Sequence, residues 1–128
     1  MSATTVLIVE DDPNARGDVA ALLRAGGYDP IAVEDGEDAL RLLRDGLDPA
    51  LILLDMVLPR IDGWQFFALR AQDPLLSDIP VLVMTGVDFA TKEWAIAMGG
   101  TDLLPKPIDP TTLLDLVRRY ATPDGVTP

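Results

Sequence analysis

The chain has 128 residues, of which 21 are acidic and 10 are basic, so its formal net charge is −11. This length is typical of one domain. Cysteine and histidine are both absent, which excludes disulfides, Cys/His zinc sites and Ser-His-Asp triads. The negative charge argues against a surface for nucleic acid or anionic membranes, because phosphates attract cations.

The first residues lack the features of a targeting segment. Residues 1–5 contain no basic residue and no apolar stretch of signal-peptide length. No apolar run approaches the roughly 20 residues that a membrane-spanning helix needs. We therefore expect a cytoplasmic protein that does not contact a membrane.

Short apolar runs predict five strands. The first, third and fourth runs are uninterrupted rather than alternating, which is typical of strands covered on both faces. The other two are weaker. The predicted strands are Val6–Val9, Pro30–Val33, Ala50–Leu54, Val81–Met84 and Asp102–Leu104.

Amphipathic segments between the strands predict five helices. Each begins at an aspartate that can cap a helix, in two cases followed by proline at the first helical position. In the third helix, Asp62 and Gln65 have the spacing of a capping box. The predicted caps are Asp12, Asp35, Asp62, Asp88 and Asp109.

Alternating strands and helices predict a doubly wound α/β fold, with a parallel sheet and helices on both faces. Ligands of such folds bind beyond the carboxyl ends of the strands. The polar residues that directly follow the strands are therefore the candidate site residues. They are Glu10, Asp11 and Asp12 after the first strand, Asp55 after the third, Thr85 after the fourth and Lys106 after the fifth.

Carboxylates dominate these strand ends. Three consecutive acids and Asp55 repel one another unless a cation joins them, and oxygen ligands without histidine or cysteine suit a hard ion such as Mg²⁺. Taken singly, Asp12 has the simpler role of capping a helix. The set of polar residues at four separate strand ends favours a functional site.

Asp55 is also a candidate nucleophile. A carboxylate held at the end of a buried strand can attack phosphorus and form an acyl phosphate. The transferred phosphoryl group then needs positive charge and hydrogen bonds around its oxygens. Mg²⁺, the ammonium of Lys106, the hydroxyl of Thr85 and backbone N–H groups would supply them.

Four motifs together resemble the receiver domain of bacterial two-component response regulators, over about residues 5–120. Each motif is modest alone, but all four in this order make the match highly specific. They are Val-Glu-Asp-Asp-Pro at 9–13, Leu-Leu-Asp-Met-Val-Leu-Pro at 53–59 with Asp62-Gly63, Val-Met-Thr-Gly at 83–86, and Pro-Lys-Pro at 105–107.

The resemblance implies a flavodoxin-like fold with five strands in the order 2-1-3-4-5 and Asp55 as the phosphoacceptor. The phosphoryl group would come from a phosphohistidine on a sensor histidine kinase or a histidine phosphotransfer protein. Lys106 would pair with the phosphoryl group, Thr85 would close onto it, and the Lys106–Pro107 bond would be cis.

The resemblance also implies a magnesium site. Asp11, Asp55 and the backbone carbonyl of Val57 would bind Mg²⁺, and Glu10 would act through water. Asp12 either joins the metal shell or only caps the helix.

Two features depart from the family's pattern. Leu103 stands where the family usually has an aromatic residue that swings inward when the threonine moves, and Phe89 and Trp94 are the nearby aromatic residues. Val57 and Val87, two residues after Asp55 and Thr85 respectively, offer no polar side chain to an attacking water.

The resulting prediction is a receiver domain over residues 1–121, followed by a flexible tail or the start of a linker at 122–128. It would act as a phosphorylated signalling switch and not as an enzyme, apart from slow autodephosphorylation. Its partners would be the kinase or phosphotransfer protein and a downstream protein or separate output domain. No nucleic acid would bind through this domain.

Three alternatives differ in their chemistry. An aspartyl-phosphate phosphatase needs a second acid two residues after the nucleophile, where Val57 stands. A flavin protein needs a phosphate loop rich in Ser, Thr and Gly after the first strand, where three acids would repel phosphate. The third alternative is a receiver-like interaction module that acts without phosphorylation, and Leu103 keeps it open.

Overall fold

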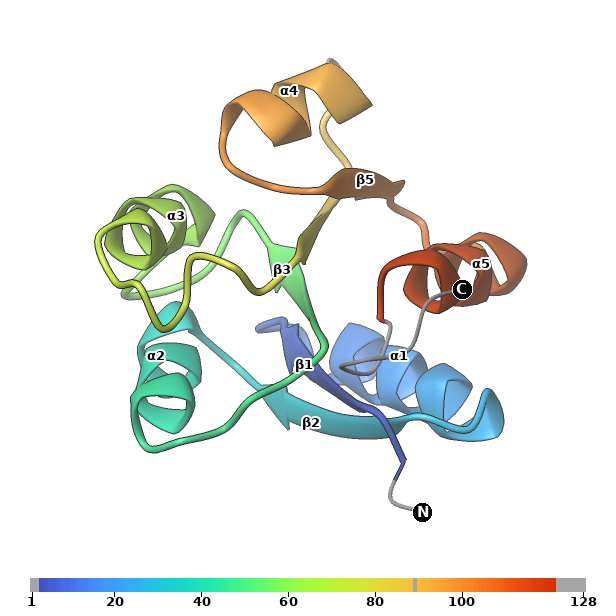
Figure 1. Ribbon diagram of the computed structural model, residues 1–128. Coiled ribbons are helices and arrows are strands. Elements are labelled where there is room, and N and C mark those ends of the chain that lie inside the picture. The colour runs from blue at the N-terminus through green and yellow to red at the C-terminus, as the bar shows by residue number, and fades with distance from the viewer. Residues whose placement is uncertain (1–2, 89, 122–128) are drawn as a thin grey trace.

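A parallel sheet runs through the middle of the molecule with helices on both of its faces (Figure 1). The computed structural model describes residues 3–88 and 90–121. Five strands lie in the order β2-β1-β3-β4-β5, which confirms the predicted fold and strand order. The strands are Thr5–Val9 (β1), Asp29–Val33 (β2), Leu51–Asp55 (β3), Val81–Thr85 (β4) and Asp102–Pro105 (β5).

The helices divide into two layers. In Figure 1, α1 and α5 cover one face of the sheet, α2 and α3 cover the other, and α4 lies next to β5. The helices are α1 (Pro13–Ala25), α2 (Gly36–Arg44), α3 (Gly63–Ala71), α4 (Lys92–Ala97) and α5 (Pro110–Tyr120). None of the helices in the described part of the chain has the length and apolarity needed to cross a membrane.

The central strands are buried on both sides. Successive residues of β1, β3 and β4 contribute alternately to the core beneath α1 and α5 and to the core beneath α2, α3 and α4. Leu7 and Ile8, for example, are neighbours in β1 that lie in different cores, and both have no exposed surface. Burial on both faces accounts for the uninterrupted apolar runs.

Four of the five predicted helix caps are confirmed. The carboxylates of Asp12, Asp35, Asp62 and Asp109 each accept a hydrogen bond from the backbone N–H three residues further on. In α3, Asp62 N–H also donates to Gln65 Oε1 at 3.0 Å, which completes the predicted capping box.

The predicted cap of α4 is wrong. Asp88 lies in a turn closed by the bond from Ala90 N–H to the Val87 carbonyl, at 3.1 Å. The helix begins only at Lys92, and its cap is Thr91, whose hydroxyl oxygen accepts from Trp94 N–H at 3.1 Å. Both residues are good caps, so the preceding turn decides between them. Phe89 and the tail at 122–128 lie outside the described residues.

Candidate functional site

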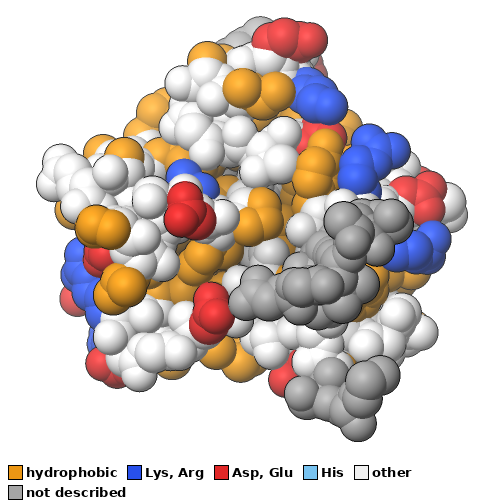
Figure 2. All heavy atoms as spheres, in the orientation of Figure 1, with side chains coloured by type: hydrophobic (Ala, Val, Ile, Leu, Met, Phe, Trp, Pro, Cys, Tyr) orange, Lys and Arg blue, Asp and Glu red, His pale blue; other side chains and the backbone are white. Residues whose placement is uncertain are grey.

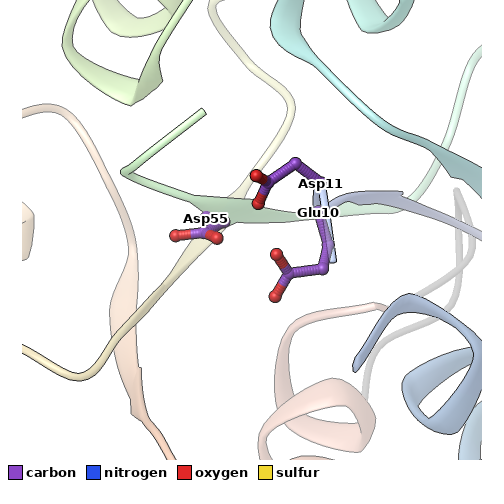
Figure 3. Close-up of side chains that lie close together, drawn as sticks. All are labelled: Glu10, Asp11 and Asp55. Carbon is purple, nitrogen blue, oxygen red and sulfur yellow. The ribbon is translucent and has the colours of Figure 1, made fainter. Parts of the chain in front are cut away.

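The register of the sheet brings the predicted acids together. Val9 of β1 lies opposite Leu54 of β3, so Glu10 and Asp55 leave neighbouring strands side by side. One carboxylate oxygen from each of Glu10, Asp11 and Asp55 lies within 4.8 Å of the others. Figure 3 shows these three carboxylates converging from the ends of β1 and β3.

One lysine joins two of these acids. The Nζ atom of Lys106 lies 2.6 Å from Glu10 Oε1 and 3.2 Å from Asp55 Oδ2. The position of Lys106 is set by the end of β5, because its N–H donates to the Thr85 carbonyl at 2.9 Å. The Lys106–Pro107 peptide bond is cis, as expected.

The electrostatic balance of this cluster is negative. Glu10 is 1% exposed and Asp55 is 6% exposed. Burial raises the pKa of Glu10, and Asp55 adds to this effect against the influence of Lys106. Burial lowers the pKa of Lys106, but the hydrogen bond to Glu10 and the charge of Asp55 outweigh it, so the net shift is upward.

The donor set fits a hard divalent cation. Three carboxylates face one ammonium, so the cluster has fewer positive than negative groups. All of the candidate ligand atoms are oxygens, which Mg²⁺ prefers. Glu10, Asp11 and Asp55 are therefore the side chains that would hold such an ion.

Asp12 lies outside this group of three. Its Oδ2 atom accepts from Ala15 N–H at 3.2 Å and so caps α1. Its own N–H donates to Glu10 Oε2 at 3.3 Å. The structure thus shows the helix-capping role of Asp12, and a place for Asp12 in the metal shell stays a prediction.

Thr85 and Asp55 each begin a tight turn at the end of a buried strand. Asp55 Oδ1 accepts from Val57 N–H at 3.1 Å, and Thr85 Oγ1 accepts from Val87 N–H at 3.2 Å. The side chain of Val57 is 67% exposed. A role for the Val57 carbonyl as a metal ligand stays a prediction.

The loop between β3 and α3 is anchored by Arg60, a residue that the sequence did not indicate. Arg60 has a φ of 59°, in the left-handed region, and its guanidinium forms an ion pair with the buried Asp35 at the cap of α2. Burial acts to raise the pKa of Asp35, but hydrogen bonds from Asp38 N–H and Arg60 hold it below its ordinary value. Gly63 is required here, because a Cβ atom would lie 2.7 Å from Met56 Cα.

The corner formed by α4, β5 and α5 holds a second charged cluster. Asp102, only 6% exposed, accepts from the Tyr120 hydroxyl at 2.7 Å and lies 3.5 Å from Lys92 Nζ. Leu103 is half-buried beside it. Trp94 of α4 contacts Trp64 of α3 edge to face, with ring centroids 6.4 Å apart.

Charged side chains are dispersed over the visible surface. Figure 2 shows acidic and basic groups scattered over this face of the molecule, with apolar side chains between them. No continuous basic patch appears among the described residues on that face. This distribution and the charge of −11 agree with the prediction that nucleic acid is not a ligand, which stays a prediction.

Buried carboxylates at the ends of β1 and β3, joined by a lysine after β5 in a sheet of order 2-1-3-4-5, define a flavodoxin-like receiver domain. The family model for the response regulator receiver domain matches residues 6–118. The chain belongs to this family, and the suspected resemblance is confirmed.

Three similar proteins come from Pseudomonas aeruginosa. Protein PilH is 34% identical over 113 residues, which cover 88% of this chain and 93% of PilH. Response regulator protein FleR is 40% identical, over 93% of this chain but 25% of FleR. The solved receiver domain of sensor histidine kinase PA1611, with a magnesium ion coordinated in its active-site cleft, is 26% identical with a TM-score of 0.84, over 94% of this chain and 98% of that one.

Proposed function

We propose that Asp55 accepts a phosphoryl group from a phosphohistidine and that this modification switches the protein between two signalling states. The observation that carries the proposal is the placement of Asp55. Asp55 is 6% exposed at the end of β3, with Lys106 Nζ 3.2 Å from Oδ2 and two further acids beside it. A rigid carboxylate beside a fixed cation suits nucleophilic attack on phosphorus.

The transfer of the phosphoryl group from a phosphohistidine to Asp55 needs no oxidant or reductant. A new bond forms between an Asp55 carboxylate oxygen and phosphorus, while the bond between phosphorus and the donor's imidazole nitrogen breaks. The imidazole nitrogen keeps the electron pair of the broken bond and takes up a proton. The donor would be a sensor histidine kinase or a histidine phosphotransfer protein, because this chain contains no histidine.

The residues around Asp55 have separate tasks. Glu10, Asp11 and Asp55 would hold Mg²⁺, together with the Val57 carbonyl, and the bound ion supplies positive charge toward the phosphoryl oxygens. Lys106 contributes a second positive charge, already placed beside Asp55. The Thr85 hydroxyl, which accepts from Val87 N–H in this structure, would turn to the phosphoryl group.

The output of the switch is a protein contact. PilH and this chain are of similar extent, whereas FleR is about four times as long as the matched region. We therefore propose that the domain signals to a downstream protein or to an output domain outside these residues. It would be cytoplasmic and would not be an enzyme beyond slow loss of its own phosphoryl group.

Intact-mass measurement after treatment with acetyl phosphate and Mg²⁺ tests the proposal. The wild-type protein should gain one phosphoryl group that is labile to acid and base, and Asp55→Asn should gain none. Asp48→Asn is the control, since Asp48 is an exposed acid in the loop before β3. An Asp55→Asn protein that gains the same labile mass would show that Asp55 is not the acceptor.

The same measurement distinguishes the second candidate function, an interaction module that acts without phosphorylation. Leu103 favours this candidate, because the usual aromatic side chain is absent from β5. A wild-type protein that binds Mg²⁺ but never gains mass, with acetyl phosphate or with a phosphorylated kinase, would support it.

A further inference from the structure

Arg16 contacts the backbone of the loop that carries the acids. It lies in the first turns of α1 and is half-buried. Its Nη1 atom donates to the Glu10 carbonyl at 3.0 Å and to the Asp11 carbonyl at 3.3 Å. A single nitrogen of the guanidinium therefore bridges two consecutive peptide groups, and these belong to two of the three converging acids.

The other contacts of this loop act at different points. Glu10 N–H donates to the Val33 carbonyl at 3.1 Å and ties the start of the loop to β2. The Asp12 carboxylate fixes the end of the loop to α1. Arg16 holds the backbone between these anchors, while Asp12 N–H and Lys106 Nζ hold the Glu10 carboxylate itself.

The chemistry of the contact leaves the carboxylates available. The planar guanidinium of arginine presents several fixed donors. Among the residues that the structure describes, Arg16 takes part in none of the ion pairs with carboxylates. It binds carbonyl oxygens instead, so it does not compete with a cation for Glu10, Asp11 or Asp55.

We infer that Arg16 is a positioning residue for the cation site: it fixes the backbone of Glu10 and Asp11 so that their carboxylates converge with that of Asp55. This inference rests on the proposed function, since it concerns the Mg²⁺ that phosphorylation requires. Groups that contact the metal ligands but not the metal, and so orient the ligands, typically contribute about 10- to 100-fold to metal affinity.

The sign of the effect separates this role from a purely electrostatic one. A positive charge near a cation site repels the cation, so removal of a merely neighbouring arginine would tighten Mg²⁺ binding. Removal of a positioning residue weakens binding instead, because the carboxylates lose their common orientation. A role limited to the stability of α1 would change the melting temperature and leave the affinity unchanged.

Calorimetric titration of Mg²⁺ into the unphosphorylated protein at constant ionic strength is the test. Arg16→Met should raise the Kd by about 10- to 100-fold, and Arg16→Lys, which keeps one donor group, should raise it less. Arg24→Met is the matched control. Arg24 lies in the last turn of the same helix and is exposed, and its substitution removes the same charge.

The outcomes are distinct. Unchanged or tighter binding by Arg16→Met, or an equal loss in Arg24→Met, overturns the role of Arg16 and leaves the proposed function intact. Absence of Mg²⁺ binding by the wild-type protein overturns the cation part of the proposed function, and the inference with it. If thermal melts show that Arg16→Met is unfolded, Arg16→Gln keeps a neutral donor, and its Kd must still rise.

Discussion

The two ends of β5 carry charged clusters of opposite construction. After the strand, one cation is shared by two buried carboxylates, since Lys106 contacts both Glu10 and Asp55. At its start, one buried carboxylate is shared by several donors, since Asp102 accepts from Tyr120 and from Leu103 N–H and pairs with Lys92. The first cluster has three carboxylates for one ammonium, whereas in the second one carboxylate pairs with one ammonium and accepts two further hydrogen bonds.

The difference separates a site from a structural contact. Burial raises the pKa of Glu10, which means that the protein makes its negative charge costly. Burial acts in the same direction on Asp102, but Tyr120, Leu103 N–H and Lys92 outweigh it and hold the pKa of that carboxyl below its ordinary value. The surroundings of Asp102 therefore favour its charged form, whereas three carboxylates that share one ammonium leave negative charge that a bound cation can balance.

The largest expected effect is the difference in stability between variants of the two lysines, Lys106 and Lys92. Lys106→Met leaves Glu10 and Asp55 without their shared cation, and we expect the free energy of unfolding without Mg²⁺ to fall by about 3 kcal/mol. Lys92→Met removes a half-exposed partner of Asp102 and should cost no more than about 1 kcal/mol. Urea unfolding of both variants measures these losses, and equal losses would contradict the distinction.

The second prediction concerns the excess of acids. Mg²⁺ at about 100 times its Kd should stabilise the wild-type protein by about 2.7 kcal/mol. Asp11→Asn should lose most of this stabilisation and should be more stable than wild type without metal, because like charges then repel less. Thermal melts with and without Mg²⁺ provide the measurement.

Asp102→Asn is the control for the second prediction. This variant should be less stable than wild type without metal but should keep the full Mg²⁺-dependent stabilisation. If Asp11→Asn instead retains the wild-type response to Mg²⁺, Asp11 is not a ligand.

The third prediction concerns the cluster around Asp102. Tyr120→Phe removes the 2.7 Å hydrogen bond to Asp102 and should cost about 1.5 kcal/mol near neutral pH, the lower end for a bond to a charged group. Because the pKa of Asp102 is lowered by folding, its contribution is present above the ordinary pKa of an aspartate and disappears as the pH falls through the lowered value.

The difference in stability between wild type and Tyr120→Phe should therefore shrink at acid pH. Urea unfolding at neutral pH and in the acid range measures this change, with Tyr28→Phe as the control in a half-buried tyrosine outside the cluster. A difference that stays constant with pH would show that the Tyr120 hydroxyl does not depend on the charge of Asp102.

The sequence predicted the first cluster and missed the second for a physical reason. Glu10, Asp11 and Asp55 directly follow apolar runs, so a local pattern places them at the same edge of a parallel sheet. Asp102 was only the first residue of a weak strand, and its partner Tyr120 lies 18 residues further on. Contacts of this kind depend on how α5 packs, which no local pattern specifies.

In the loops, too, local contacts could be predicted from the sequence and contacts between distant residues could not. Four caps were predictable because each depends on a residue and the N–H three positions later. The link between Arg60 and Asp35 spans 25 residues, and the backbone of Arg60 is left-handed. The contact of Arg16 with two carbonyls likewise depends on the turn between β1 and α1. Only the folded structure brings these side chains to their partners.

The last and smallest effect concerns the lifetime of the phosphorylated state. Val57 and Val87 close the two tight turns that begin at Asp55 and Thr85, and their N–H groups donate to Asp55 Oδ1 and Thr85 Oγ1. An attacking water needs a polar side chain to orient it, and a valine cannot do so. We therefore expect slow dephosphorylation that accelerates in Val57→Asn and Val87→Glu by up to about tenfold, or roughly 1.4 kcal/mol of barrier.

Because Val57 is exposed, the expected effect of its substitution is not a consequence of lost packing. Its side chain is 67% exposed, so Val57→Asn removes little buried surface. Leu75→Asn is the control, because Leu75 is 79% exposed and lies in the segment before β4. Decay of the phosphorylated proteins is followed by intact mass after removal of acetyl phosphate. Unchanged decay in Val57→Asn and Val87→Glu, with Mg²⁺ affinity intact, would show that these two side chains do not set the lifetime.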